Sequence, residues 1–162
     1  MFERFPSGGS IFLDANVLVY HVLEGRPSCA VLLRRAAARE IRAVTSPVVL
    51  GEVAHCLTLA ETVQRWNLPS SKAALNLLRR HPEHLAACTI ARTYIAQFLQ
   101  SHVQVLPVRR RELVLAVDLS RRYHLLTNDA LILATMTVHG LTHLATNDED
   151  FRRVPHLTLW RP

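Results

Sequence analysis

The sequence has few cysteines and none of the usual signals that direct a chain to a membrane or out of the cell. Its three cysteines, Cys29, Cys56 and Cys88, are far apart, and no CxxC pair occurs. This spacing argues against a disulfide framework or a zinc finger and fits a reducing compartment. Glu3 and Arg4 precede any apolar run, unlike the start of a signal peptide. Because no uncharged apolar run is long enough to cross a bilayer, we expect a cytoplasmic protein without contact to a membrane.

Lysine is almost absent, although the chain is basic. Lys72 is the single lysine, arginines supply the remaining positive charge, and the formal net charge is +6. A basic balance favours a polyanionic partner, nucleic acid above all, while a basic surface that only aids solubility is the simpler alternative. Neither a P-loop nor a GxGxxG motif is present, so the sequence gives no sign of nucleotide binding through these loops.

Short apolar stretches alternate with helical patterns along the whole chain. Strands are expected near residues 10–13, 43–45, 103–108, 143–146 and 156–160, and helices near residues 16–23, 27–39, 47–66, 71–80, 82–101, 109–123 and 128–139. This alternation is typical of an α/β domain with a mainly parallel sheet covered on both faces. The length fits one domain over residues 1–162, with an extended helical region at about 68–101. Functional side chains in such sheets lie beyond the carboxyl ends of the strands.

An aspartate interrupts the apolar stretch Ser10–Tyr20. Asp14 follows a run that is typical of a buried strand, and Asn16 stands two residues later. A buried carboxylate is costly unless it has a partner or a cation. Asn16 could hold this carboxylate or cap the next helix, and a simple helix-capping role for Asp14 is the plain alternative.

Two more acids lie on helices in unusual surroundings. Glu52 shares a helical face with Val49 and Val53, so it is expected to point inward, and a buried salt bridge to an arginine is the alternative. Asp129 falls in the first turn of the helix expected from residue 128, with Thr127 or Asn128 as its cap. The helix dipole there favours a charged carboxylate, and dipole stabilisation alone would also explain this position.

Asp148 directly follows the fourth expected strand, and Asp150 is a second candidate in the same loop. A polar turn is the alternative for both residues.

Taken together, carboxylates stand after the first, second and fourth strands, and Asp129 opens the helix before the fourth strand. Such charges repel one another, and Mg²⁺ or Mn²⁺, which prefer oxygen ligands, would offset the repulsion. The cluster therefore predicts a divalent metal site and, with the basic surface, phosphodiester chemistry.

These motifs resemble those of the PIN-domain ribonucleases, and most closely the VapC-type toxins of bacterial toxin–antitoxin pairs. The matching segments are Leu13–Val17 (LDANV), Glu52, Asn128–Ile132 (NDALI) and Ala145–Phe151 (ATNDEDF). The resemblance implies a PIN-like three-layer α/β/α fold with a five-stranded, mainly parallel sheet in the order 3-2-1-4-5. It implies an endoribonuclease that depends on Mg²⁺ or Mn²⁺ and leaves a 5′-phosphate and a 3′-hydroxyl.

The same resemblance implies roles for individual residues. Asp14, Asp129 and Asp148 would hold the metal, and Glu52 would reach it directly or through water. Thr146 matches a hydroxyl residue that steadies the first aspartate, and Asn16 matches a polar helper.

Partners are also implied by the resemblance: an RNA substrate, a small antitoxin protein and a second copy of the chain in a homodimer. An RNA-processing PIN nuclease that is not a toxin is one alternative function. A PIN-like module that binds RNA or protein without cutting is another. The target RNA and the number of metal ions stay open.

Two other α/β classes place an aspartate after the first strand. A response-regulator receiver needs a lysine late in the chain, whereas Lys72 lies in the middle. Phosphatases of the haloacid-dehalogenase type usually have an aspartate where Asn16 stands, and they also use a basic residue, generally lysine. Neither class is favoured.

Nine histidines raise the question of a zinc site. His84 and Cys88 are four residues apart, and His81 is close to them. No second ligand pair with zinc-like spacing follows, so exposed or otherwise hydrogen-bonded histidines are expected.

Arg109, Arg110 and Arg111 precede a helix, where the dipole disfavours cations. Contacts with the RNA backbone would explain this placement, although a solvated run of charge is the simpler interpretation.

Overall fold

The protein is built around a parallel sheet, seen here in a computed structural model that describes residues 2–162. The first residue of the expected domain thus lies outside the described part. The strands within it are β1 (Ser10–Leu13), β2 (Arg42–Thr45), β3 (Gln104–Val105), β4 (His143–Ala145) and β5 (Thr158–Trp160). They pair in the order β3-β2-β1-β4-β5, and every pairing is parallel. The predicted α/β class and strand order are confirmed.

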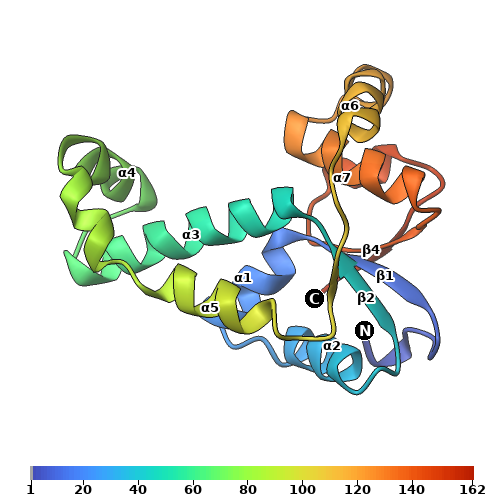
Figure 1. Cartoon of the computed structure of the whole chain (residues 1–162), viewed down its shortest axis with the longest axis horizontal. Helices are drawn as coiled ribbons and strands as arrows, with labels where there is room; N and C mark the ends of the chain where they lie inside the picture. The colour runs from blue at the N-terminus through green and yellow to red at the C-terminus, as the bar shows by residue number, and fades with distance from the viewer. Residues whose placement is uncertain (1) are drawn as a thin grey trace.

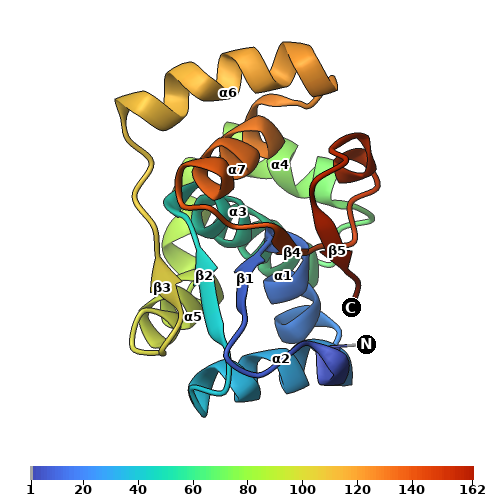
Figure 2. The ribbon, with the colours of Figure 1, turned by 90° about the vertical axis from the view of Figure 1, so that its right-hand side faces the viewer.

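Helices connect the strands and extend the molecule away from the sheet. Figure 1 shows α3 (Pro47–Arg65) running from the sheet to α4 (Ser71–Arg80) at the far end of the molecule. Figures 1 and 2 place α6 (Arg110–Tyr123) and α2 (Pro27–Ala37) at opposite ends. The α-helices are α1 (Ala15–Leu23), α2 (Pro27–Ala37), α3 (Pro47–Arg65), α4 (Ser71–Arg80), α5 (Ile90–Phe98), α6 (Arg110–Tyr123) and α7 (Thr127–Val138). Short 3-10 helices are η1 (Phe2–Arg4), η2 (Pro82–Ala87) and η3 (Asp150–Arg153). None of these helices has the length and apolar character that crossing a bilayer would require.

The central strand explains the apolar run at the start of the sequence. β1 pairs with β2 on one side and β4 on the other, and Ile11, Phe12 and Leu13 are all fully buried. Because successive residues of a strand face opposite sides, an unbroken buried run means that both faces of the sheet are covered. The strand ends at Leu13, and the next residue, Asp14, is also nearly buried.

Local signals place several helix ends where the sequence predicts them. The Ser46 hydroxyl accepts a hydrogen bond from the Val49 amide at 3.5 Å, and Pro47 occupies the first turn of α3. Ser70 caps α4 in the same way, through the Ala73 amide at 3.2 Å. Beyond α7, Gly140 adopts a φ of 65°, a left-handed conformation that glycine tolerates and that ends the helix.

The prediction of a single helix over residues 82–101 is wrong. The chain forms η2, breaks at residues 88–89, and restarts as α5. The buried Glu61 side chain of α3 causes the restart, because its Oε2 accepts the Ile90 amide at 2.8 Å while Oε1 accepts Arg65 at 2.9 Å. Glu61 thus pairs with Arg65 four residues later on α3 although its own side chain is only 4% exposed.

The third strand is shorter than the expected residues 103–108. Only Gln104 and Val105 form β3, at the edge of the sheet. The Leu106 amide still donates to the Thr45 carbonyl at 2.8 Å, but Pro107 has no N–H to continue the ladder.

Candidate active site

Asp14 joins the central strand to the first helix. Its amide donates to the Ala145 carbonyl at 3.1 Å, which extends the contact between β1 and β4 by one residue. Its Oδ1 accepts the Ala15 amide at 2.6 Å, so the side chain caps α1. Asp14 is only 6% exposed, and the capping role therefore holds a carboxylate in a nearly buried position.

The second carboxylate oxygen of Asp14 is held by two side chains. Oδ2 accepts hydrogen bonds from the Thr146 hydroxyl and from Asn16 Nδ2, both at 2.6 Å. A threonine hydroxyl has one proton to donate and can accept others. Thr146 Oγ1 accordingly accepts Asn16 Nδ2 at 3.1 Å and the Asp148 amide at 2.9 Å. The end of β4 is thus fastened to the start of α1.

Asn147 and Tyr20 extend this network and were not singled out from the sequence. The Asn147 amide donates to Asn16 Oδ1 at 3.0 Å, and its side chain donates to the Tyr20 hydroxyl at 3.3 Å. Tyr20 lies four residues after Asn16 on α1, and this spacing puts both side chains on one face of the helix. This four-residue spacing is the feature of the sequence that could have indicated a role for Tyr20 beside Asn16.

The two candidates for the fourth acid differ in their partners. Asp148 Oδ1 accepts only a backbone donor within the described residues, the Asp150 amide at 2.8 Å. The Asp150 carboxylate is instead paired with Arg153, whose Nη2 lies 2.8 Å from Oδ1. Within residues 2–162, Asp148 therefore has no arginine partner, unlike Asp150.

Glu52 of α3 contacts the first turn of α7, which carries Asp129. Glu52, half-buried on α3, accepts a hydrogen bond from Asn128 Nδ2 at 3.4 Å, next to Asp129 in the first turn of α7. No arginine pairs with Glu52 in residues 2–162, so the salt-bridge alternative is wrong. The prediction that Thr127 or Asn128 caps α7 is also wrong. Leu126 occupies the cap position, without a side-chain hydrogen bond.

Electrostatic repulsion links these acids. Burial, assisted by the charges of Glu52 and Asp148, raises the pKa of Asp14 to about 6, although the hydrogen bonds from Thr146 and Ala15 act to lower it. Burial raises the pKa of Asp129 to about 7, again assisted by neighbouring carboxylates. The helix dipole was expected to favour the charged form of Asp129, whereas burial and like charges shift its pKa in the opposite direction.

The carboxylates of Asp14, Glu52, Asp129 and Asp148 consequently share one electrostatic environment at the carboxyl edge of the sheet. An all-oxygen donor set with unneutralised charge is what a hard divalent cation binds. The residues present thus fit Mg²⁺ or Mn²⁺.

The contacts of Arg109, Arg110 and Arg111 do not involve the four acids. All three are exposed at the start of α6. Arg111 donates to the Val138 carbonyl at 3.4 Å, and the Arg109 amide donates to Glu112 at 2.8 Å. No hydrogen bond or ion pair in the described part of the chain joins them to the four acids.

Comparison with known proteins gives a consistent picture. A family model described as the PIN domain matches residues 11–157. Ribonuclease VapC2 of Methanocaldococcus jannaschii is 28% identical over 149 residues, which cover 92% of this chain and 91% of that protein. Ribonuclease VapC6 of the same organism is 36% identical over 59 residues, or 36% of this chain and 39% of that protein.

Solved structures show the same fold at low identity. VapBC2 from Rickettsia felis, bound to a DNA fragment from its promoter, matches with a TM-score of 0.63 and 16% identity, covering 94% of this chain and 98% of the other. Mycobacterium tuberculosis VapC20, a toxin that cleaves the sarcin–ricin loop, matches with a TM-score of 0.60 and 21% identity, covering 94% and 99%. At these identities the likeness concerns the fold alone.

Proposed function

The chain belongs to the PIN-domain family, and from that premise we propose that it is a metal-dependent endoribonuclease and the toxin of a toxin–antitoxin pair. The observation that carries the proposal is the convergence of Asp14, Glu52, Asp129 and Asp148, with two of their pKa values raised to about 6 and about 7. The relative named a ribonuclease, which aligns with 92% of this chain, supports the same activity.

The four acids would hold Mg²⁺ or Mn²⁺. A bound divalent cation stabilises negative charge on a phosphodiester and lowers the pKa of water at the site. The protein's part is to present carboxylates in a fixed geometry. Thr146 and Asn16 do so for Asp14, because their two hydrogen bonds fix the position of Oδ2.

We assign the fourth position to Asp148 and a supporting one to Asp150. Thr146 fixes the Asp148 amide at 2.9 Å, and the charge of Asp148 is the strongest among the carboxylates that raise the Asp129 pKa. Asp150 is paired with Arg153 and affects Asp129 less. Glu52 reaches the ion directly or through water, oriented by the Asn128 amide. Cleavage would leave a 5′-phosphate and a 3′-hydroxyl.

Two protein partners belong to the proposal. The neighbouring solved structures include VapBC complexes, which supports a small antitoxin as partner. An apolar surface of α6, formed by Leu113, Val114 and Val117, is more than half exposed and supports a homodimer. We place the protein in the cytoplasm, where RNA and an antitoxin would meet it. An adjacent gene for a small DNA-binding protein would support the toxin, and its absence would favour an RNA-processing nuclease.

Cleavage of a labelled RNA tests the activity. The wild-type protein should cut with Mg²⁺ or Mn²⁺ and not with EDTA, and Asp14→Asn should lose cleavage. Unchanged activity in Asp14→Asn would overturn the central role of the acids. Asp148→Asn should cost much more activity than Asp150→Asn, and the reverse order would move the fourth position to Asp150. RNA binding without any cleavage by the wild type would favour the non-cleaving module.

The contribution of Arg109, Arg110 and Arg111 to RNA binding is tested separately. If these exposed arginines contact phosphates, neutralising all three should weaken RNA affinity and reduce the slope of log affinity against log salt. An unaltered slope would show that they form only a solvated run of charge.

A further inference from the structure

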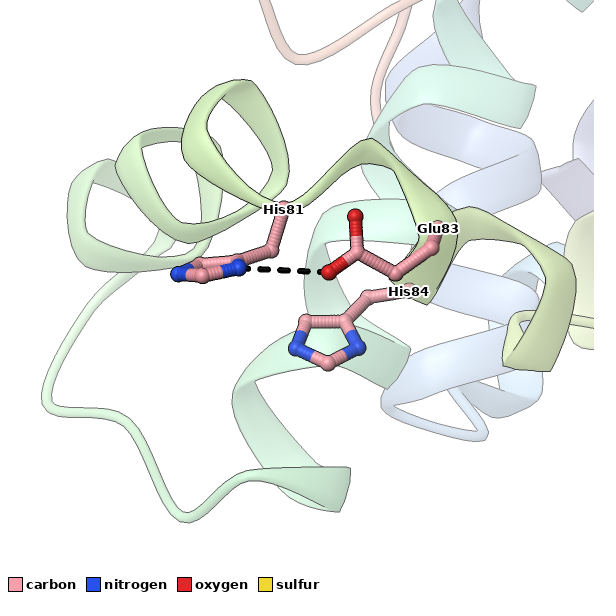
Figure 3. A group of neighbouring side chains, drawn as sticks. All are labelled: His81, Glu83 and His84. Carbon is pink, nitrogen blue, oxygen red and sulfur yellow. Dashed lines mark hydrogen bonds and ion pairs between the residues drawn. The ribbon is translucent and has the colours of Figure 1, made fainter.

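Far from the four acids, three potential metal ligands meet at the end of α4. His81, Glu83 and His84 each offer a ligand atom, and these atoms all lie within 4.8 Å of one another. Figure 3 shows the Glu83 carboxylate pointing toward the two imidazole rings. The sequence spacing does not indicate this group, because it points to His84 and Cys88, which are four residues apart. In the structure the Cys88 thiol contacts Thr62 Oγ1 at 3.5 Å instead.

The backbone brings the three residues together. His81 caps the carboxyl end of α4, where its amide donates to the Leu77 carbonyl at 2.8 Å. Pro82 then opens η2, and the His84 amide donates back to the His81 carbonyl at 3.1 Å. This tight turn brings the His81 and His84 rings next to each other, with their planes 35° apart. The carboxyl end of a helix also carries a partial negative charge, which favours a cation.

Contacts with neighbouring groups restrict the side chains. His81 Nδ1 lies 3.2 Å from Glu83 Oε1, and the two imidazole centroids are 5.6 Å apart. The His84 ring packs on Trp66, the cap residue of α3, at a centroid distance of 4.6 Å. A ring held in this way loses less conformational freedom when it binds an ion.

We propose that His81, Glu83 and His84 bind a Zn²⁺ ion, with water completing a tetrahedral shell. Two imidazole nitrogens and one carboxylate suit Zn²⁺, whereas Mg²⁺ prefers oxygen ligands alone. The two metal sites of the chain therefore differ in ligand chemistry. Because His84 packs on Trp66, bound Zn²⁺ fastens the turn after α4 to the end of α3. This inference does not rest on the proposed ribonuclease activity.

Zinc uptake in excess Mg²⁺ tests the proposal, because Mg²⁺ occupies the all-oxygen site. The whole wild-type chain should bind one equivalent of Zn²⁺ by calorimetry, and Co²⁺ in its place should give the visible absorption of a tetrahedral site. His81→Ala and Glu83→Gln each remove one ligand and should weaken Zn²⁺ binding at least about tenfold, since even partners outside the ligand shell contribute that much. His102→Ala removes an exposed histidine elsewhere and should leave the affinity unchanged.

A second readout guards against loss of folding. Zn²⁺ should raise the Tm of the wild type and of His102→Ala, because a ligand that binds only the folded state stabilises it. It should not raise the Tm of His81→Ala, whose Tm without zinc shows that the variant is folded. RNA cleavage in Mg²⁺ should be equal in all three proteins. Absence of Zn²⁺ uptake by the wild type, or equal uptake by His81→Ala and Glu83→Gln, would overturn the proposal.

Discussion

Replacing Asp129 by asparagine is expected to stabilise the metal-free protein near neutral pH. Burial, assisted by the charges of Asp148, Asp14 and Glu52, raises the Asp129 pKa from 3.8 to about 7. One pKa unit corresponds to about 1.4 kcal/mol, so the full rise is about 4 kcal/mol between the charged and neutral forms. Because Asp129 is only half-buried, solvent screens part of this cost, and the expected gain in unfolding free energy is about 2 kcal/mol. Asparagine has the same shape without the charge.

The gain should depend on pH in a defined direction. The folded protein holds a proton on Asp129 more tightly than the unfolded chain does, so the wild type loses stability as pH rises. This loss is absent below pH 3.8, grows up to about pH 7 and is constant above it. The advantage of Asp129→Asn should therefore be small near pH 4 and complete near pH 8.

Urea denaturation in EDTA measures this effect. The matched control is Asp118→Asn, which changes an exposed aspartate on α6 and should not alter the pH dependence. Added Mg²⁺ should stabilise the wild type more than Asp129→Asn, because the variant has lost one ligand. An Asp129→Asn protein that is no more stable near pH 8, or a gain of equal size at every pH, would refute the reasoning.

Three further predictions follow from the same contacts. The apparent affinity for Mg²⁺, measured by titration, should fall as pH drops below about 7, because Asp129 and then Asp14 must lose their protons to bind it. Thr146→Val removes a hydroxyl that makes three hydrogen bonds and should destabilise the protein in urea by about 1–3 kcal/mol, while Thr146→Ser should restore most of the loss. Glu61→Gln should lower the unfolding free energy by about 1–3 kcal/mol and leave RNA cleavage intact. Burial raises the Glu61 pKa, but the hydrogen bonds from Ile90 and Arg65 lower it more. The difference in stability between wild type and Glu61→Gln should therefore shrink in acid, where Glu61 becomes protonated.

Much of the fold could be predicted because its signals are local. The apolar run before Asp14 indicates a central strand, and Ser46–Pro47 and Gly140 mark helix ends within a few residues. The break after η2 could not be predicted, because Glu61 of α3 supplies the hydrogen bond that starts α5 from 29 positions away.

In the candidate site, too, contacts between residues close in sequence could be predicted, whereas effects of distant segments could not. Asp14 and Asn16 are close in sequence, so their contact could be anticipated. The raised pKa of Asp129 could not be anticipated, because it results from burial and from acids of three other segments, and the local rule of the helix dipole gives the opposite sign. The grouping of Glu83 with His81 likewise depends on a turn whose shape Pro82 alone does not specify.

Cleavage of RNA by Asp129→Asn, measured beside its stability, tests the central claim most directly. We propose that the four acids lower the stability of the metal-free protein and bind a divalent metal. The variant should therefore be more stable than the wild type in EDTA near neutral pH and should cut RNA far more slowly in Mg²⁺ or Mn²⁺. Misfolding could not explain that combination. Full cleavage by a folded Asp129→Asn protein would contradict the account.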